Sequence, residues 1–242
     1  RKRLSPMQTR VGMGRSTFAA LNTASNWGMT KVRSTTKAAT SNEAKVTIGG
    51  VLGSFDILDV WGNGAVSLAR SCQPRIEPET VFGMRATPAA DATLEALWEA
   101  IDWVAPGFEI VQSHLPDWKF KAADTVADGA LHARLLVGQR TPVRALAADA
   151  ASLEQALAAA AVTLHRGAQQ VDQGAGANVL DGPLHALSHF VRELQACPGA
   201  AGLKAGDVVT TGTWTDAWPV APNDQWTARF SAPLMGLAVT FN

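Results

Sequence analysis

The sequence predicts one domain that combines β-strands with amphipathic helices. From Val46 to Ala69, β-branched and apolar residues are interrupted by glycines, a pattern typical of short strands joined by tight turns. Strand-like runs return from Asp207 to the end of the chain, and helical periodicity occurs between these two regions. The 242 residues, 47% of them hydrophobic and 17% charged, can bury a complete core.

A capped helix is predicted after residue 90. Asp91 and Thr93 precede an apolar stripe over residues 94–101 that recurs with the spacing of one helix face. The helix should end before Pro106 and serve packing. Nearer the start of the chain, only Ser16–Leu21 has enough periodicity to suggest a short helix.

Two more helical stretches follow. Residues 145–161 are rich in alanine and favour a helix, although residues 161–164 alternate enough to suit a strand. A further helix is predicted from Pro183 over residues 183–194. His185 and His189 share one face of it, with the spacing of a two-histidine metal pair, but no His-Glu-x-x-His pattern accompanies them. We therefore interpret both as packing or solvent-facing residues.

Composition excludes several classes of partner. Lys plus Arg equals Asp plus Glu at 21 each, so no global basic field attracts nucleic acid or an anionic membrane. No apolar run approaches the length of a membrane span, and the basic start Arg1-Lys2-Arg3 leads into polar residues. Cys72 and Cys197 lack Cys-x-x-Cys spacing, which argues against a disulfide scaffold or structural zinc. We expect a cytoplasmic protein whose partner is a small molecule.

The segment Pro74–Glu79 contains a Glu-x-Glu pattern. Side chains alternate faces along a strand, so Glu77 and Glu79 should project from the same side, close enough to bind one ion. A divalent cation would relieve their repulsion, and hard oxygen donors favour Mg²⁺, Mn²⁺ or Ca²⁺. The alternative is an ordinary solvent-facing strand. Pro78 disfavours that alternative, because proline belongs at a sheet edge or a bulge, where active sites often lie.

Glu109 is the third acidic residue of interest. It lies within residues 104–111, an otherwise apolar, strand-like run in which a bare carboxylate would be expensive to bury. Together with the Glu-x-Glu pair, it would complete a cradle of three carboxylates.

Three other polar segments each have two interpretations. Residues 29–37, which include Lys31, form either a solvated turn or part of a site. Asp56 or Asp59 could be turned inward as an acid–base group, although such residues more often serve turns. Residues 117–129 are dense in charge and are either functional or a polar loop held by Asp caps.

Five stretches, in this order and spacing, resemble the 2-keto-4-pentenoate hydratase group of the fumarylacetoacetate hydrolase superfamily. The resemblance runs from about residue 27 to the end, and the family's N-terminal helical segment is largely missing or altered. The stretches are Gln73–Glu79, Val104–Val111, Asp117–Asp128, Val179–Leu184 and Leu203–Gly212.

The resemblance implies an α+β fold built on a strongly bent, mixed β-roll with flanking helices. We accordingly expect residues 1–45 to form a partial N-terminal helical and loop segment, and residues 46–242 a metal-binding β-roll domain. Glu77, Glu79 and Glu109 match the family's metal ligands, which usually hold Mg²⁺ or Mn²⁺. The resemblance also implies a homo-oligomer.

The other site residues come from the same resemblance. Lys31 matches the family's active-site lysine, Asp56 is the best match for its acid–base aspartate, and Asp124 and Asp128 match its Asp-Thr-Val-Ala-Asp motif. Asp124 is expected to be catalytic. The residues expected to contact the substrate are Arg33, Lys121, Asp128 and Thr213.

The sequence departs from the family pattern at two places that matter for the expected activity. Arg33 replaces a glycine and could narrow the pocket or bind a second carboxylate. Residues 129–131 read Gly-Ala-Leu instead of Asn-Ala-Ser, which removes an amide and a hydroxyl.

The resemblance implies that the substrate is a short 2-oxo or 2-hydroxydienoic acid from aromatic meta-cleavage catabolism, which binds the metal through its carboxylate and C2 oxygen. Hydration is the favoured reaction. The alternatives are decarboxylation or acylpyruvate hydrolysis, and a non-catalytic relative that keeps the fold.

Overall fold

The computed structural model describes residues 31–34, 43–48, 51–59, 63–196 and 200–242. For the strands before residue 63, only the backbone path and the strand pairing are described. The expected helix at residues 16–21 lies outside the described residues.

Nine strands form a sheet that closes on itself. Their order is β12-β5-β11-β1-β2-β3-β7-β6-β8, and β5 also pairs with β6, which completes a roll. The pairing of β3 with β7 is parallel and the others are antiparallel, so the sheet is mixed, as expected. The strands are β1 (Lys31–Ser34), β2 (Glu43–Ile48), β3 (Val51–Asp59), β5 (Arg75–Met84), β6 (Ile101–Val111), β7 (His132–Val137), β8 (Thr141–Pro142), β11 (Asp207–Thr213) and β12 (Trp218–Pro219).

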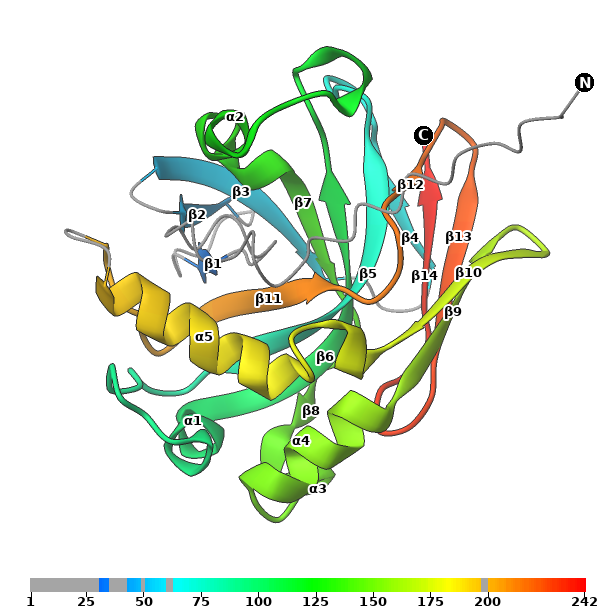
Figure 1. Cartoon of the computed structure of the whole chain (residues 1–242). Coiled ribbons are helices and arrows are strands. Elements are labelled where there is room, and N and C mark those ends of the chain that lie inside the picture. The colour runs from blue at the N-terminus through cyan, green and yellow to red at the C-terminus, as the bar shows by residue number, and fades with distance from the viewer. Residues whose placement is uncertain (1–30, 35–42, 49–50, 60–62, 197–199) are drawn as a thin grey trace, which may run out of the picture.

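A smaller five-stranded sheet stands beside the roll (Figure 1). Its order is β10-β9-β13-β14-β4, with β14 parallel to β4 and the other pairs antiparallel. Its strands are β4 (Asn63–Val66), β9 (Ala161–Arg166), β10 (Gln169–Ala175), β13 (Gln225–Phe230) and β14 (Leu237–Phe241).

The main core lies between the outer face of the roll, the helices and the smaller sheet. It includes Phe82 and Phe108 from the roll, Leu157 and Phe190 from helices, and Trp226 from the smaller sheet, all nearly inaccessible to solvent. Figure 1 shows α2 apart from the other helices, at the opposite end of the roll. The helices are α1 (Leu94–Ala100), α2 (Ala122–Ala127), α3 (Val143–Leu146), α4 (Ala150–Ala159) and α5 (Pro183–Ala196), with short 3₁₀ turns η3 (Pro116–Trp118), η4 (Gly129–Leu131) and η5 (Gly176–Asn178).

A second, smaller apolar cluster fills the inside of the roll. It consists of Val81, Ala105, Leu135, Val137 and Val208. Alternation along the strands places Val81 on the same face of β5 as the two glutamates of the Glu-x-Glu pattern, and Ala105 on the same face of β6 as Glu109. The acidic residues therefore continue the interior face of the roll.

Strand β5, which carries two of the acidic residues, also contains a proline. Pro78 pairs with Phe108 of β6, and its carbonyl accepts a hydrogen bond from the amide of Trp214 on the other side. A residue's N–H and C=O point to the same side of a strand, so Pro78 removes no donor from the β5–β6 ladder. On this other side, β5 pairs with β12 before Pro78 and with β11 after it. The β5–β11 pairing has a register shift close to this point. The irregularity itself is on β11, between Thr210 and Thr213, so Pro78 lies next to it and not within it.

The helices predicted within the described residues are present, with shifted ends. Thr93 caps α1 through a hydrogen bond from the Ala96 amide, but the helix ends at Ala100, because Ile101 is already extended and begins β6. The alanine-rich stretch divides between α4, capped by Asp149, and strand β9. Both interpretations of residues 145–161 were therefore partly right.

Strands β1 and β2 pair within the same sheet as the rest of the roll. Strand β2 also spans the expected boundary between residues 45 and 46. That boundary stays a prediction, since residues 1–30 lie outside the described part of the chain. None of the described helices is long and apolar enough to cross a membrane.

Candidate metal centre

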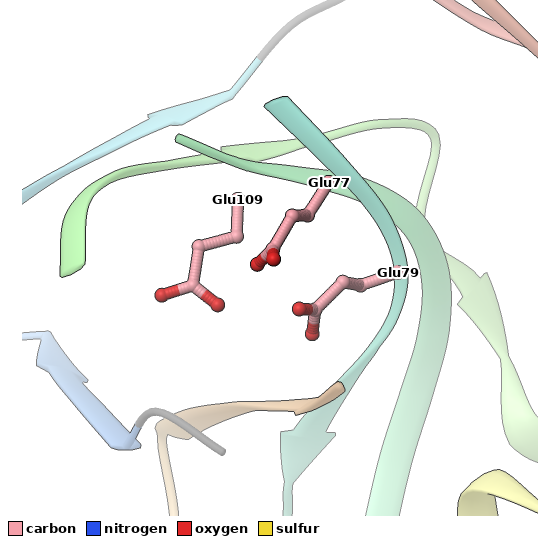
Figure 2. Close-up of side chains that lie close together, drawn as sticks. All are labelled: Glu77, Glu79 and Glu109. Carbon is pink, nitrogen blue, oxygen red and sulfur yellow. The ribbon is translucent and has the colours of Figure 1, made fainter. Parts of the chain in front are cut away.

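Glu77, Glu79 and Glu109 converge on one point. Glu77 pairs directly with Glu109 across the β5–β6 ladder, and Glu79 lies two residues further along the same face. One carboxylate oxygen from each residue lies within 4.8 Å of the others. Figure 2 shows the three carboxyl groups pointing toward a common space. Glu79 and Glu109 are buried and Glu77 is partly buried.

The cluster makes it costly to ionise Glu77 and Glu79. Burial raises the pKa of Glu77 from its usual 4.5 to about 8, Glu109 adds repulsion, and Arg75 opposes both effects. Burial also raises the pKa of Glu79 well above the usual range, with further contributions from Glu109 and Glu77, and a hydrogen bond from Gly212 opposes them. Without a cation, the site retains protons near neutral pH.

The surroundings of Glu79 fit a bound cation. Its Oε2 accepts a hydrogen bond of 2.9 Å from the amide of Gly212, which has a φ of 108° on β11. Its Oε1 is buried and has no hydrogen-bond partner among the residues whose side chains are described. An ionised carboxylate oxygen buried in this state is unfavourable unless it gains a proton or binds an ion. Three carboxylates are a donor set for a hard divalent cation.

His132 was not predicted from the sequence as a site residue. Its side chain is fully buried at the start of β7, and its Nδ1 lies 2.5 Å from Oε1 of Glu109. The two residues are 23 positions apart, so no local spacing signals the contact. Only the pairing of β6 with β7 brings them together.

The Asp117–Trp118 pair docks beside the strand that carries Glu77. The Trp118 Nε1 donates to the carbonyl of Gln73, and the Asp117 amide donates to the Gln73 Oε1. The Arg75 guanidinium lies 4.4 Å from the centre of the Trp118 ring, a cation–π contact. Arg75 is thereby held where it opposes the raised pKa of Glu77.

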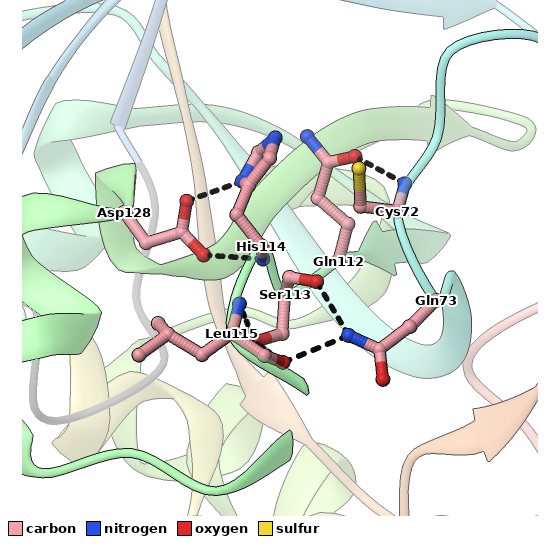
Figure 3. A network of polar contacts seen from close by, with 7 residues as sticks. All are labelled: Cys72, Gln73, Gln112, Ser113, His114, Leu115 and Asp128. Atoms are coloured by element: carbon pink, nitrogen blue, oxygen red, sulfur yellow. Dashed lines mark hydrogen bonds and ion pairs between the residues drawn. The ribbon is translucent and has the colours of Figure 1, made fainter. Parts of the chain in front are cut away.

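The two aspartates of the Asp-Thr-Val-Ala-Asp stretch have structural partners. The Asp124 carboxylate accepts a hydrogen bond from the Lys121 amide at the start of α2, which matches our capping interpretation. Asp128 contacts both the backbone amide and Nδ1 of His114 (Figure 3). Their roles toward substrate stay predictions.

Figure 3 also shows how the loop that contains His114 is tied to residues 72 and 73. The Gln73 side chain donates to the carbonyls of Ser113 and Leu115. The Cys72 amide donates to the Gln112 side chain. These bonds hold the end of β6 against the start of β5.

Thr213, another predicted substrate contact, lies beside the acidic cluster in the sheet. It pairs with Glu79 across β11 and β5, and its hydroxyl bonds within the turn to Thr215. Lys121 is exposed before α2. Their contacts with substrate stay predictions.

Lys31, Arg33 and Asp56 lie on strands for which only the backbone is described. Lys31 and Arg33 are on β1, paired with Val209 and Asp207 of β11. Asp56 on β3 pairs with Arg134 of β7. The side chains of the three, and that of the alternative Asp59, lie outside the described part of the structure, so their roles stay predictions.

The histidine pair on α5 has protein partners. The Nδ1 of His185 lies 2.8 Å from Oε1 of Glu154, and Arg192 contacts His189. The interpretation of both histidines as packing or solvent-facing residues stays a prediction.

Comparison with solved structures defines the class of the fold. A 4-oxalocrotonate decarboxylase from Pseudomonas putida G7, solved with magnesium and adipate, superimposes with a TM-score of 0.67 at 27% identity. The match covers 79% of this chain and 70% of that one. A fumarylpyruvate hydrolase from Pseudomonas aeruginosa, with Mn²⁺ and pyruvate, has a TM-score of 0.58 at 14% identity and covers 79% and 78%. The chain has the α+β fold of the fumarylacetoacetate hydrolase superfamily, as expected.

Comparison with curated proteins narrows the class. A 2-hydroxyhexa-2,4-dienoate hydratase of Comamonas testosteroni is 35% identical over 176 residues, 71% of this chain and 62% of that protein. A 2-keto-4-pentenoate hydratase of Paraburkholderia xenovorans (strain LB400) is 30% identical over 171 residues, 70% and 60%. The chain spans about three fifths of the length of these relatives. No protein-family model matches it. The comparisons confirm homology to the 2-keto-4-pentenoate hydratase group.

Proposed function

We propose that this chain is a divalent-metal-dependent hydratase that adds water to short 2-hydroxy-2,4-dienoates of the 2-keto-4-pentenoate type. The convergence of Glu77, Glu79 and Glu109 at the interior face of the roll is the observation that carries the proposal. Two relatives with 30% identity or more are named as hydratases, which supports hydration over other reactions of the superfamily.

The three glutamates would hold the cation, for which we propose Mg²⁺ or Mn²⁺. Ions of both kinds, and Ca²⁺, are bound in solved proteins of this fold. When bound, such a cation supplies a Lewis acid that polarises the C2 oxygen of the substrate. Glu79 is held for this task by Gly212 and by its position opposite Thr213.

The chain's own residues would bind the dienol and move its protons. Lys31 is proposed to hold the substrate carboxylate or to transfer a proton, and Asp56 and Asp124 to assist ketonisation. Conjugation in the keto form makes C4 electrophilic, so water adds there. Substrate contacts are proposed for a further set, namely Arg33, Lys121, Asp128 and Thr213.

A second candidate is decarboxylation of a related 2-oxo acid. It is favoured by a 4-oxalocrotonate decarboxylase of Pseudomonas sp. (strain CF600), 29% identical over 72% of this chain and 63% of that protein. The decarboxylase structure with a TM-score of 0.67 gives the same indication. Both reactions use stabilisation of an enolate, so the metal cluster alone does not separate them.

An ultraviolet assay tests the proposal. The dienol band of 2-hydroxypenta-2,4-dienoate and of longer or dicarboxylic analogues is followed with and without Mg²⁺, alongside release of CO₂. Metal-dependent loss of the band without CO₂ supports hydration, and CO₂ release supports the second candidate. Metal binding without turnover of any of these substrates would indicate a non-catalytic relative.

We also propose a homo-oligomeric state, because the family resemblance implies one. A cytoplasmic location is a further part of the proposal. Light scattering of the purified protein tests the oligomeric state.

A further inference from the structure

A register shift between β6 and β7 turns His132 toward the metal centre. Glu109 pairs with Leu135 and Ile110 with Arg134, but Val111 pairs with His132, so Ala133 is an extra residue on β7. In a regular ladder Ala133 would face the interior of the roll, like Leu135, and His132 would face outward. Bulges commonly redirect a side chain in this way.

The packing on both sides of the bulge agrees with this reading. Ala133 packs against the main core outside the roll, whereas Leu135 belongs to the cluster inside it. His132 is fully buried and its Nδ1 lies 2.5 Å from Oε1 of Glu109. The extra residue therefore places an imidazole against a carboxylate that is itself 2% exposed.

The backbone that leads into His132 is strained. Gly129, Ala130 and Leu131 have φ values of 62°, 55° and 66°, and two of these three residues carry a Cβ. Left-handed conformations of non-glycine residues are unfavourable and persist where the surroundings impose them. Here the Gln112 amide donates to the Leu131 carbonyl, and Ala130 packs on the interior cluster. The strained turn therefore positions His132 next to the three glutamates.

We propose that His132 is a positioning residue for the metal centre, in which its Nδ1–H donates to Glu109 and holds that carboxylate toward the ion. This inference rests on the proposed metal-dependent function. An ionised carboxylate only accepts hydrogen bonds, so Nδ1 must carry the proton. Partners that orient metal ligands in this way typically change metal affinity by about 10–100-fold when they are lost.

Two substitutions separate hydrogen bonding from packing. His132→Phe keeps a ring but has no donor, whereas His132→Asn places an amide N–H near the position of Nδ1. Mn²⁺ affinity is measured by calorimetry on the full chain, and thermal unfolding is recorded for each variant without metal. His165→Asn is the matched control, because His165 is also buried but bonds Thr163 on the smaller sheet.

We expect the Phe variant to bind Mn²⁺ about 10–100-fold more weakly, and the Asn variant and the control to stay within about threefold of wild type. Unchanged affinity in the Phe variant would overturn the inference, as would an equal loss in both His132 variants, which would indicate packing alone. Wild-type protein that binds no Mn²⁺ would instead overturn the metal centre and this inference together.

A measurement on the wild-type protein does not depend on the folding of variants. Nuclear magnetic resonance of ¹⁵N-histidine-labelled protein with Mg²⁺ identifies which ring nitrogen of His132 carries the proton. A protonated Nδ1 supports the inference, and an unprotonated Nδ1 overturns it.

Discussion

Glu77 of β5 and Glu109 of β6 are directly paired across one antiparallel ladder, so their carboxyl groups leave the sheet side by side. Like charges at paired positions are destabilising. Here the strands also place Glu79 on the same face, which adds a third carboxyl group within 4.8 Å. A sheet selected only for stability would not favour this arrangement, whereas a cation makes it favourable.

The first prediction concerns ligand removal. Glu77→Gln keeps the shape of the side chain and removes its charge, so Mn²⁺ affinity measured by calorimetry should fall by more than about 100-fold, beyond the loss expected for an indirect partner. Circular dichroism should show an unchanged fold. Glu193→Gln on α5 is the control and should bind normally. Normal binding by the Glu77 variant would argue against the centre.

The second prediction concerns pH. The pKa of Glu77 is about 8 in the metal-free fold, against 4.5 in an unfolded chain. Between these values the folded protein holds more protons than the unfolded one, so its stability falls as pH rises. Below about pH 4.5 this loss is absent, and above about pH 8 it is complete. The raised pKa of Glu79 acts in the same direction.

Thermal unfolding from pH 5 to pH 8 measures this effect. The Tm of the metal-free protein should decrease over this interval, and the decrease should be smaller in Glu77→Gln, which removes one of the titrating groups. Added Mn²⁺ should raise the Tm more at pH 8 than at pH 5, since it competes with protons. Equal slopes for both proteins would contradict the prediction.

The common orientation of Glu77 and Glu79 was predictable because strand alternation acts over two residues. Glu109 was recognisable because a charge stood in an apolar run. The helix from Pro183 was likewise predictable from its first-turn proline. Each of these signals is local to a few residues.

The contacts that complete the site were not predictable, because they depend on pairing between distant segments. The approach of His132 to Glu109 requires both the β6–β7 pairing and its one-residue shift. The stacking of Arg75 on Trp118 requires a turn with Asp117 and Trp118 at positive φ. The parallel pairing of β3 with β7 likewise joins residues 78 positions apart in the sequence.

The third prediction concerns the amide that holds Glu79. Gly212 has a φ of 108°, so Gly212→Ala should lower the free energy of unfolding by about 1–3 kcal/mol. It should also weaken Mn²⁺ binding, because the displaced N–H no longer fixes Oε2 of Glu79. Gly206→Ala is the matched control: its φ is 83°, with open space around an added Cβ. Urea unfolding and calorimetry should show lost stability in both variants and lost affinity only at 212.

The fourth prediction separates proton transfer from metal binding. Lys31→Met should reduce kcat/KM for 2-hydroxypenta-2,4-dienoate by about 10²–10⁴-fold, the usual contribution of a positioned acid–base group. Mn²⁺ affinity should stay within about threefold of wild type, because a lysine is a cation and not a ligand for one. The exposed Lys204 provides the control, since Lys204→Met should alter neither quantity.

If Lys31→Met keeps full activity, Lys31 does not act in the reaction, and Asp56 or Asp124 is the acid–base group. If the variant loses metal binding as well, Lys31 supports the cluster itself, and the proposed division between a metal centre and a separate proton-transfer residue is wrong.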